Sequence, residues 1–352
     1  MTQRVIGFDV ARALAIFGMV IVNFKVVMSE EVGGNEWLMQ FVYLFEGRAS
    51  ALFVVLAGVG VTLLTNKARQ STNPKMITQA RLNLLKRSLL LIAIGVAYMP
   101  IWDADILHYY GFYFLIAVII FTFSDQKLLI TTILLTLAFP VLMLLFDYEQ
   151  NWDWETFAYQ NLWTVEGFTL HTLFNGVHPV FPWAAFLVFG MWLGRQNLAS
   201  TSIRKQFLIY ALLAWAGTEL MFYGIYQFFS QTEEADLFLI SPIPPMPQYL
   251  ISATSSAVVI IMICLTMAER FKNSLTIKWL SQTGKLSLTL YVAHVLIGMG
   301  FLESIEMLED QPIEVSLFSA VVFCMLGIVF SIVWLRYFAT GPLEWIFRKL
   351  TH

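Results

Sequence analysis

The sequence predicts an all-α, polytopic membrane protein with about ten transmembrane helices and both termini in the cytoplasm. Two observations lead to this prediction: long apolar runs recur along the chain, and basic and acidic residues alternate between the gaps that separate them. Hydrophobic residues make up 58% of the 352 residues and charged residues only 13%, which is far from the composition of soluble domains. We therefore expect one integral membrane domain over residues 1–352, with no separate soluble domain.

Ten segments have the length of about 17 to 25 residues that a bilayer-crossing helix needs. The first of them contains Asp9 and Arg12, is longer than the apolar core of a signal peptide and is not followed by a small-residue cleavage pattern, so we expect it to be retained. The predicted spans are residues 7–28, 48–65, 84–102, 105–123, 127–147, 170–194, 206–229, 248–268, 286–303 and 314–338.

The charges in the gaps predict the orientation of these spans. All of the 21 lysines and arginines except Arg12, Lys25 and Arg48 fall at the termini, in every second gap or at the span ends beside those gaps. Loops rich in lysine and arginine stay in the cytoplasm, so both termini are expected there. The other gaps are acidic, and they form the expected outer face.

The composition excludes several classes of protein and site. The chain has no basic stripe that would bind nucleic acid. Cys264 and Cys324 fall inside predicted spans, where a thiol behaves as a small hydrophobic group. The histidines within spans lie on three different spans and have no cysteine or i, i+4 histidine partner, so no metal site is expected. The chain also lacks an internal repeat or an inverted pair of interrupted spans, which counts against a secondary transporter.

The gap at 148–169 is aromatic, with Trp152, Trp154, Tyr159 and Trp163. Aromatic side chains of this kind gather at the boundary between lipid and water. We therefore expect a segment that lies along the outer membrane surface.

Ionisable residues inside spans are costly, so each is a functional candidate that needs a partner. Asp9 and Arg12 are three residues apart and share one helical face. They form either an ion pair that fixes the first helix or an anion-binding corner. Glu219 and His294 lie deep in their spans, and a structural pair between them is left open.

Three further histidines lie in predicted outer halves of spans. Asp105 precedes His108 by three residues, as either a helix cap or a carboxylate that orients a general base. His178 directly precedes Pro179 and is followed by Pro182-Trp183, an arrangement that distorts a helix and is tolerated in membranes only where protein lines a cavity. A functional role is therefore expected for His178, whereas His171 is expected to be solvated at the interface.

Five stretches of the chain together resemble a known family. They are Gly7–Ala13 with Val22-Asn23, Glu46–Phe53 with Ala57-Gly58, Asp105–Gly111, His178–Trp183 with Gly190-Met191 and Gly194-Arg195, and Gly284–His294 followed by Trp334–Phe338 and Gly341–Trp345. This pattern resembles the YeiB-like family of bacterial membrane proteins. It is similar to the catalytic domain of heparan-alpha-glucosaminide N-acetyltransferase, within the transmembrane acyltransferase superfamily.

The resemblance implies an inner-membrane enzyme that moves an acyl group, in the first instance acetyl, from cytoplasmic acyl-CoA to an acceptor outside the membrane, such as a sugar or amino sugar. The pattern of heparan-alpha-glucosaminide N-acetyltransferase, a lysosomal enzyme, places a catalytic histidine between the first two spans. This chain has no histidine between Asn23 and Arg48, so that role is not carried over to any residue.

The residues suit such a transfer. His178 and His108 are the leading candidates for the general base, followed by His294, and Asp105 is expected to orient His108. The groups expected to bind substrate or to donate to the developing oxyanion are Asp9, Arg12, Asn23, Glu46, Arg48, Tyr110 and Trp183. The groups expected to hold the phosphates of the donor are Arg81, Lys86, Arg87, Arg204 and Lys205.

Acyl-CoA is expected as a donor substrate, without a tightly bound cofactor. The expected partners are membrane lipid and an extracytoplasmic glycan or small-molecule acceptor, and a homodimer is left open. The alternative function is a transporter or flippase-like binding protein for a lipid-linked or small polar solute, because the same polar groups would line its path. A third alternative is a catalytically inactive scaffold.

Overall fold

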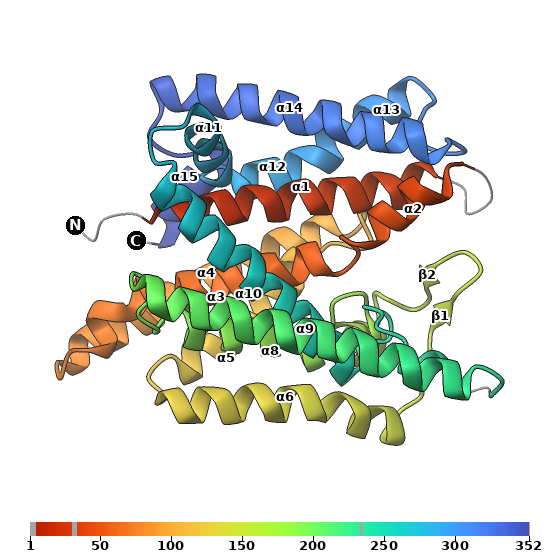
Figure 1. Cartoon of the computed structure of the whole chain (residues 1–352), viewed down its shortest axis with the longest axis horizontal. Coiled ribbons are helices and arrows are strands. Elements are labelled where there is room, and N and C mark those ends of the chain that lie inside the picture. The colour runs from red at the N-terminus through yellow and green to blue at the C-terminus, as the bar shows by residue number, and fades with distance from the viewer. Residues whose placement is uncertain (1–4, 30–33, 233–234, 352) are drawn as a thin grey trace. The chain divides into compact units, whose positions relative to one another are not determined.

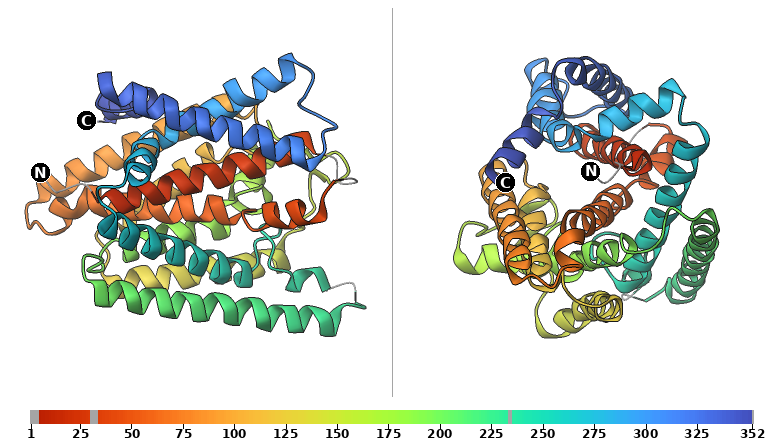
Figure 2. Two further views of the ribbon diagram at one scale, coloured as in Figure 1. Left: turned by 45° about the horizontal axis from the view of Figure 1, so that its top comes forward. Right: turned by 90° about the vertical axis from the view of Figure 1, so that its left-hand side faces the viewer.

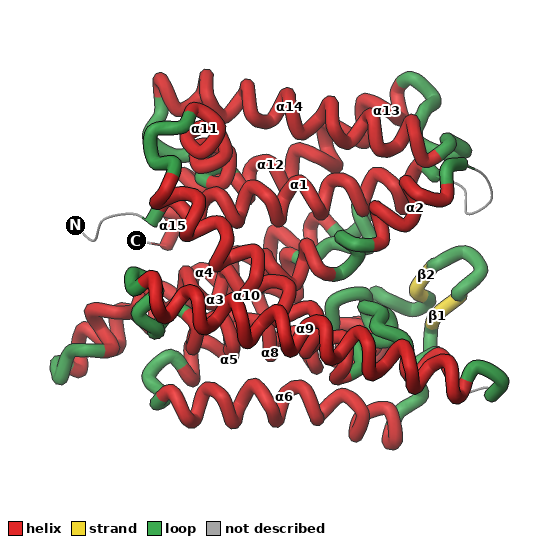
Figure 3. Tube along the Cα trace, viewed as in Figure 1, coloured by secondary structure: helices red, strands yellow, loops and turns green. Residues whose placement is uncertain are grey.

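The computed structural model describes residues 5–29, 34–232 and 235–351, and almost all of them are helical (Figure 3). The one sheet in this described part is a pair of two-residue strands, β1 and β2. The elements are α1 Ile6–Met28, α2 Glu36–Tyr43, α3 Arg48–Arg69, α4 Pro74–Tyr98, α5 Leu107–Ile120, α6 Asp125–Leu145, β1 Trp152–Asp153, β2 Ala158–Tyr159, α7 Val165–Leu170, a π-helix His171–Asn175, α8 Val180–Leu193, α9 Thr201–Phe229, a 3-10 helix Ala235–Phe238, α10 Pro247–Arg270, α11 Leu275–Gly284, α12 Ser287–Ala293, a π-helix His294–Met299, α13 Gly300–Ser304, α14 Ile313–Tyr337 and α15 Pro342–Thr351 (Figure 1).

The chain divides into two compact units that alternate along the sequence. Unit 1 comprises Met1–Leu56, Ala199–Ala211 and Ser256–Leu350. Unit 2 comprises Ala57–Leu198, Leu212–Ser255 and Thr351–His352. Helices α3, α9 and α10 therefore each contribute one part to either unit.

The protein is a multi-pass membrane protein. Within the described residues, seven helices are long and apolar enough to cross a bilayer, or eight if the bent pair is one span. They are Ile6–Met28, Glu36–Arg69, Asp125–Leu145, Thr201–Phe229, Pro247–Arg270, Ser287–Ser304 and Ile313–Tyr337, with the pair Val165–Asn175 and Val180–Leu193 bent by 49°. Each of these coincides with a predicted span.

The predicted spans at 84–102 and 105–123 have no such helix. The first falls on α4, where Lys86 and Arg87 interrupt the apolar run and leave only residues 88–98 after them. The second falls on α5, which has 14 residues, whereas a bilayer-crossing helix needs about 20. By length and composition alone, seven or eight of the ten predicted spans therefore correspond to a helix of spanning length.

In unit 1, α1 packs against α11, α12 and α14 (Figure 2). Its alanines Ala11, Ala13 and Ala15 are buried, and small side chains let helices approach closely in membranes. The tightest approach is at Gly284 of α11, where an added Cβ would lie 1.8 Å from the backbone oxygen of Asp9. The N-terminal end of α1, with Asp9, is thereby fixed to α11.

In unit 2, α4 packs along α5, α6 packs along α8, and α5 contacts α8. An apolar cluster of Phe139, Tyr148 and Phe174 joins α6 to the segments that precede α8. Between α7 and α8 the helix is broken at residues 176–179, after the π-helical turn that begins at His171. Such breaks release backbone groups that must find other partners in a membrane.

Candidate functional site

Three histidines from separate parts of unit 2 gather around Tyr109. The ring centroid of His108 lies 6.0 Å from that of His171, and the rings are nearly parallel. The Tyr109 ring lies 5.6 Å from His171 and 6.0 Å from His178. We call His108, His171 and His178 the histidine cluster.

The close packing of α4 on α5 sets the position of His108. A Cβ at Gly95 of α4 would lie 2.1 Å from the backbone nitrogen of His108, so only glycine allows this approach. Asp105 caps α5, because its Oδ2 accepts from the backbone N–H groups of Leu107 at 2.9 Å and His108 at 3.3 Å. The same oxygen lies 3.6 Å from His108 Nδ1, which is too far for a hydrogen bond. Of the two interpretations of Asp105, the geometry favours the cap.

His171 was expected at the water interface, and this prediction is wrong. His171 is buried, and the hydroxyl of Tyr109 lies 3.0 Å from its Nδ1. Gly176 permits this contact, since an added Cβ would lie 2.1 Å from the Tyr109 hydroxyl. His171 also begins a π-helix. Such turns are rare in proteins as a whole, and those that occur are often found at functional sites.

The aromatic segment before α7 covers His171. Strands β1 and β2 pair Trp152 with Tyr159, and the Tyr159 ring meets His171 edge to face at 4.6 Å. Trp152 Nε1 donates to the backbone oxygen of Asn175, and the Tyr159 hydroxyl donates to its Oδ1. Burial raises the pKa of Tyr159, while its bond with Asn175 lowers it, so the phenol remains a neutral donor. The segment is thus partly turned inward, although Trp163 is exposed as expected for a surface residue.

His178 is the member of the cluster that is only half-buried. It lies in the break between the π-helix and α8, where the Tyr113 hydroxyl donates to its backbone oxygen at 2.5 Å. Its ring meets Trp183 edge to face at 4.5 Å. The break predicted from Pro179 and Pro182 therefore exists, and it holds His178 beside the rings of Tyr109 and Trp183.

Several buried polar atoms around the cluster have no hydrogen-bond partner among the described residues. These atoms are both ring nitrogens of His108, Nδ1 of His178, Nε1 of Trp183 and Oγ1 of Thr172. Buried polar atoms in folded proteins are nearly always bonded to protein or to ordered water. Their concentration here indicates a place where bound molecules complete the hydrogen bonding. No group of three His, Cys, Asp or Glu in the described ranges is arranged to hold a metal ion.

The fourth candidate base, His294, lies in unit 1 and begins the second π-helix. Its Nδ1 contacts the backbone oxygen of Tyr291, and the Asn23 amide lies 2.9 Å from its Nε2. Asn23 is a hydrogen-bond partner of His294, although the sequence had suggested it as an oxyanion donor. Both ring nitrogens are engaged, which is typical of a structural histidine.

The structure gives Glu219, the suggested partner of His294, other contacts. Its Oε1 accepts from Ser252 at 2.6 Å and from Trp215 at 3.1 Å, all within unit 2. In unit 1 the predicted pair of Arg12 and Asp9 is present at 2.8 Å. Glu46 and Arg48, expected on the acceptor side, lie at the turn between α2 and α3 and are partly exposed. Tyr110 is buried beside the ring of Tyr113.

The cations expected to bind phosphates are divided between the units. Arg81 and Lys86 on α4 are exposed, and Arg87 is partly buried. Arg204 is buried and bonded to Glu269 of α10, to Thr201 and to the backbone oxygen of Ala199. Lys205 beside it is exposed. A guanidinium with three partners is less suited to a phosphate, so the geometry favours the cations of α4.

Two family profiles match the chain. The one described as "Heparan-alpha-glucosaminide N-acetyltransferase, catalytic" matches residues 4–228, and the one described as "Protein of unknown function (DUF418)" matches residues 190–352. The chain is also 34% identical over 89 residues to "Uncharacterized protein YeiB" of Escherichia coli (strain K12). That similarity covers 24% of this chain and 21% of the relative, so this chain matches only about a fifth of the relative's length.

Proposed function

The chain belongs to the family of the heparan-alpha-glucosaminide N-acetyltransferase catalytic domain, and we propose that it is a membrane acyltransferase. In this proposal it moves an acyl group, in the first instance acetyl, from cytoplasmic acyl-CoA to an acceptor on the outer side of the bacterial inner membrane. A sugar or amino sugar is the proposed acceptor. The similarity to an Escherichia coli protein supports a bacterial setting.

The observation that carries the proposal is the histidine cluster with its unpartnered polar atoms. A general base must lie within hydrogen-bond reach of the proton that it removes. His178 suits this role because it is the half-buried member of the cluster, and its neighbour Trp183 has a buried Nε1 without a partner in the described part of the chain. A donor of this kind beside a base suits the stabilisation of an oxyanion.

The proposed reaction is a direct transfer. The acceptor's hydroxyl or amine attacks the thioester carbonyl carbon, and His178 takes the proton that the acceptor loses. The carbonyl oxygen becomes an oxyanion that accepts a hydrogen bond from Trp183 Nε1. The carbon–sulfur bond then breaks, and the protonated imidazole returns its proton to the coenzyme A thiolate. General-base catalysis of this kind contributes roughly 10²- to 10⁴-fold to the rate.

Ten crossings with both termini in the cytoplasm are part of the proposal. They require α4 and α5 to cross as a closely packed pair, which the approach at Gly95 supports. Tyr113 in the middle of α5 donates to the backbone oxygen of His178 just before α8, and Arg195 just after α8 donates to the backbone oxygen of Phe121 just after α5. The two helices therefore run in the same direction, with the histidine cluster at the end that the charge pattern assigns to the outside.

A second candidate function is binding and transport of a small polar solute. The observation that favours it is the broken helix before α8, because broken helices bind substrate in many transporters. The two functions differ in their need for acyl-CoA, which a solute transporter has no reason to bind.

The test uses the full chain purified in lipid nanodiscs. Acetyl-CoA is expected to raise Tm, because a ligand that binds only the folded state stabilises it. With a panel of amino sugars, release of the coenzyme A thiol is expected together with an acetylated sugar in mass spectra. Neither stabilisation nor thiol release with any acceptor would contradict the acyltransferase and favour the transporter.

A further inference from the structure

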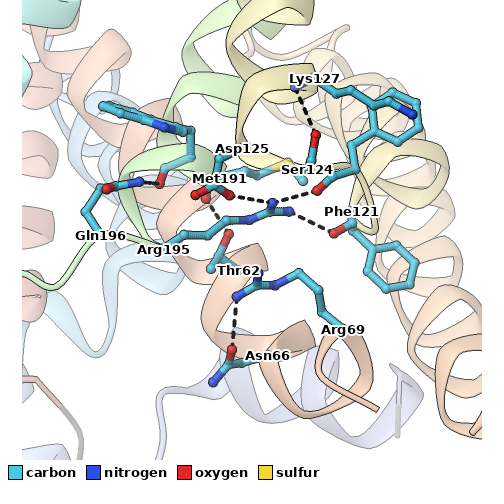
Figure 4. Close-up of polar contacts among 12 residues, drawn as sticks. Thr62, Asn66, Arg69, Phe121, Ser124, Asp125, Lys127, Met191, Arg195 and Gln196 are labelled. Atoms are coloured by element: carbon cyan, nitrogen blue, oxygen red, sulfur yellow. Dashed lines mark hydrogen bonds and ion pairs between the residues drawn. The ribbon is translucent and has the colours of Figure 1, made fainter. Parts of the chain in front are cut away.

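Four cationic side chains surround the turn between α5 and α6. Arg195, just after α8, donates to the backbone oxygens of Phe121 and Phe123 and to Asp125 at 2.9 Å (Figure 4). Arg81 of α4 donates to the backbone oxygen of Val118, and its guanidinium lies 5.6 Å from the centroid of the Phe121 ring. Lys127 of α6 lies 5.7 Å from the centroid of the Phe123 ring. The fourth is Arg69, at the end of α3, which is close enough to Arg195 for their like charges to interact.

Tight packing of α3 on α8 brings Arg69 to this turn. Thr62 of α3 donates to the backbone oxygen of Met191 at 2.7 Å. A Cβ at Gly58 would lie 2.0 Å from the backbone oxygen of Leu187, and one at Gly194 would lie 3.0 Å from Val59 Cα. The two backbones therefore touch along the contact, and α3 continues to Arg69.

The charges at this turn are not balanced by the protein. In the part of the chain that the structure describes, Asp125 is the one carboxylate bonded to any of the four cations, and it is half exposed. Arg69 has the neutral Asn66 as its hydrogen-bond partner at 3.1 Å. The Nε atoms of Arg69 and Arg195 are buried and lack a partner among the described residues. An excess of cations with unused donors suits an anion that accepts several hydrogen bonds, as a phosphate group does.

We propose that Arg69, Arg81, Lys127 and Arg195, here called the arginine cluster, bind the phosphate groups of the donor coenzyme A; in this form the inference rests on the proposed function. Only Arg81 of this cluster was among the cations expected to bind the donor. Arg195 also holds the end of α5 in place, so the test uses Arg69, whose hydrogen-bond partner is the neutral Asn66 of its own helix.

The distance between the two clusters supports this assignment. The arginine cluster lies at the end of α5, and His108 lies at its start. Helix α5 has 14 residues, so at 1.5 Å per residue its ends are roughly 20 Å apart. The pantetheine arm between phosphate and sulfur is about as long as four or five extended residues, roughly 15 Å. Phosphates held by the arginine cluster would therefore place the thioester near the histidine cluster.

A phospholipid headgroup offers the same phosphate chemistry, because the arginine cluster is on the side that the charge pattern assigns to the cytoplasmic surface. The donor is the better fit for unbalanced charge, since coenzyme A carries several phosphates and a phosphodiester headgroup only one. The experiment separates the two sources.

The experiment measures calorimetric binding of coenzyme A, inorganic pyrophosphate and phosphate-free pantetheine to the full chain in phosphatidylcholine nanodiscs. Arg69→Gln is expected to weaken binding of coenzyme A and pyrophosphate roughly tenfold, as loss of a charge-assisted contact does, and to leave pantetheine unchanged. The matched control is Lys67→Gln, which removes the same charge from an exposed position on the same helix and is expected to have less than a twofold effect. Lys127→Gln is a second test if Arg69→Gln does not fold.

The outcomes separate this inference from the proposed function. Coenzyme A binding that Arg69→Gln leaves intact, or that Lys67→Gln weakens equally, overturns the arginine cluster as the donor site and leaves the acyltransferase standing. If wild type binds pyrophosphate through Arg69 but not coenzyme A, the phosphate site stands and the acyltransferase falls. If phosphatidylglycerol nanodiscs then abolish pyrophosphate binding, the site is a headgroup site. Binding of neither probe overturns both proposals.

Discussion

The cap at the start of α5 gives the sharpest test of how the site is built. Asp105 is fully buried, and its Oδ2 accepts from the backbone N–H groups of Leu107 and His108. Asp105→Ala would leave two buried N–H groups without an acceptor, and each costs about 1–3 kcal/mol. We expect a loss of about 3 kcal/mol, which for a unit of this size lowers Tm by roughly 6–12 °C. Asp105→Asn keeps an oxygen in place and loses only the charge, so a loss of about 1 kcal/mol is expected.

The assay is thermal unfolding of the two variants and wild type in the same detergent, followed by tryptophan fluorescence and by size-exclusion chromatography. The expected order of Tm is wild type, then Asp105→Asn, then Asp105→Ala. Equal losses in both variants would refute the cap, because the charge facing His108 would then carry the stability. An unchanged Tm for Asp105→Ala would mean that water replaces the carboxylate at no cost.

Two further predictions concern packing and pH. Gly95→Ala should separate α4 from α5, because its Cβ would lie 2.1 Å from the backbone nitrogen of His108. Overpacking of this kind costs about 1–3 kcal/mol, so Tm should fall. The control is Gly217→Ala, whose Cβ would meet nothing within 4 Å and which should not lower Tm. Burial raises the pKa of Glu344 in α15 above 4.5, although its bonds to Thr289 lower it, so the folded chain binds this proton more tightly than the unfolded chain. This contribution to stability is therefore present below about pH 4.5 and declines as pH rises through the raised folded pKa. Thermal unfolding between pH 4.5 and 7 should show a smaller decline in Glu344→Gln than in wild type, and parallel curves would contradict this assignment.

Most of the spans could be predicted from the sequence because apolar length is a property of the chain alone. The exceptions show the limit of that signal. Residues 84–102 begin with apolar leucines, but Lys86 and Arg87 fall within the helix that forms there. Residues 105–123 include the cap at Asp105, so the helix starts only at Leu107 and is short. In both places local capping and charge placement, rather than mean hydropathy, set the length of the apolar helical stretch.

The site was predicted in part. His108 and His178 were chosen as candidates from Asp105 and from the prolines that distort α8, and both signals are local. Their convergence with His171 depends on close approaches between helices, including the one at Gly176. The sequence carries no direct signal for such contacts.

His171 was missed because its depth depends on the aromatic segment that folds over it. The spacing of Trp152 and Tyr159 is the signal that could have indicated this, because a short hairpin with two inward rings needs a surface to cover. Asn175 joins that hairpin to the π-helix through its side chain and backbone. No sequence motif marked it as a candidate residue. The contact between His294 and Asn23 could likewise not be predicted, because the two residues are 271 positions apart along the chain.

The central claim is that His178 removes the acceptor's proton within the histidine cluster. The most direct measurement is the rate of acetyl transfer by His178→Ala in nanodiscs, with acetyl-CoA binding measured on the same sample. The account predicts a rate at least about 10²-fold below wild type with donor affinity and Tm unchanged. A variant that folds, binds the donor and transfers acetyl groups at the wild-type rate would contradict it.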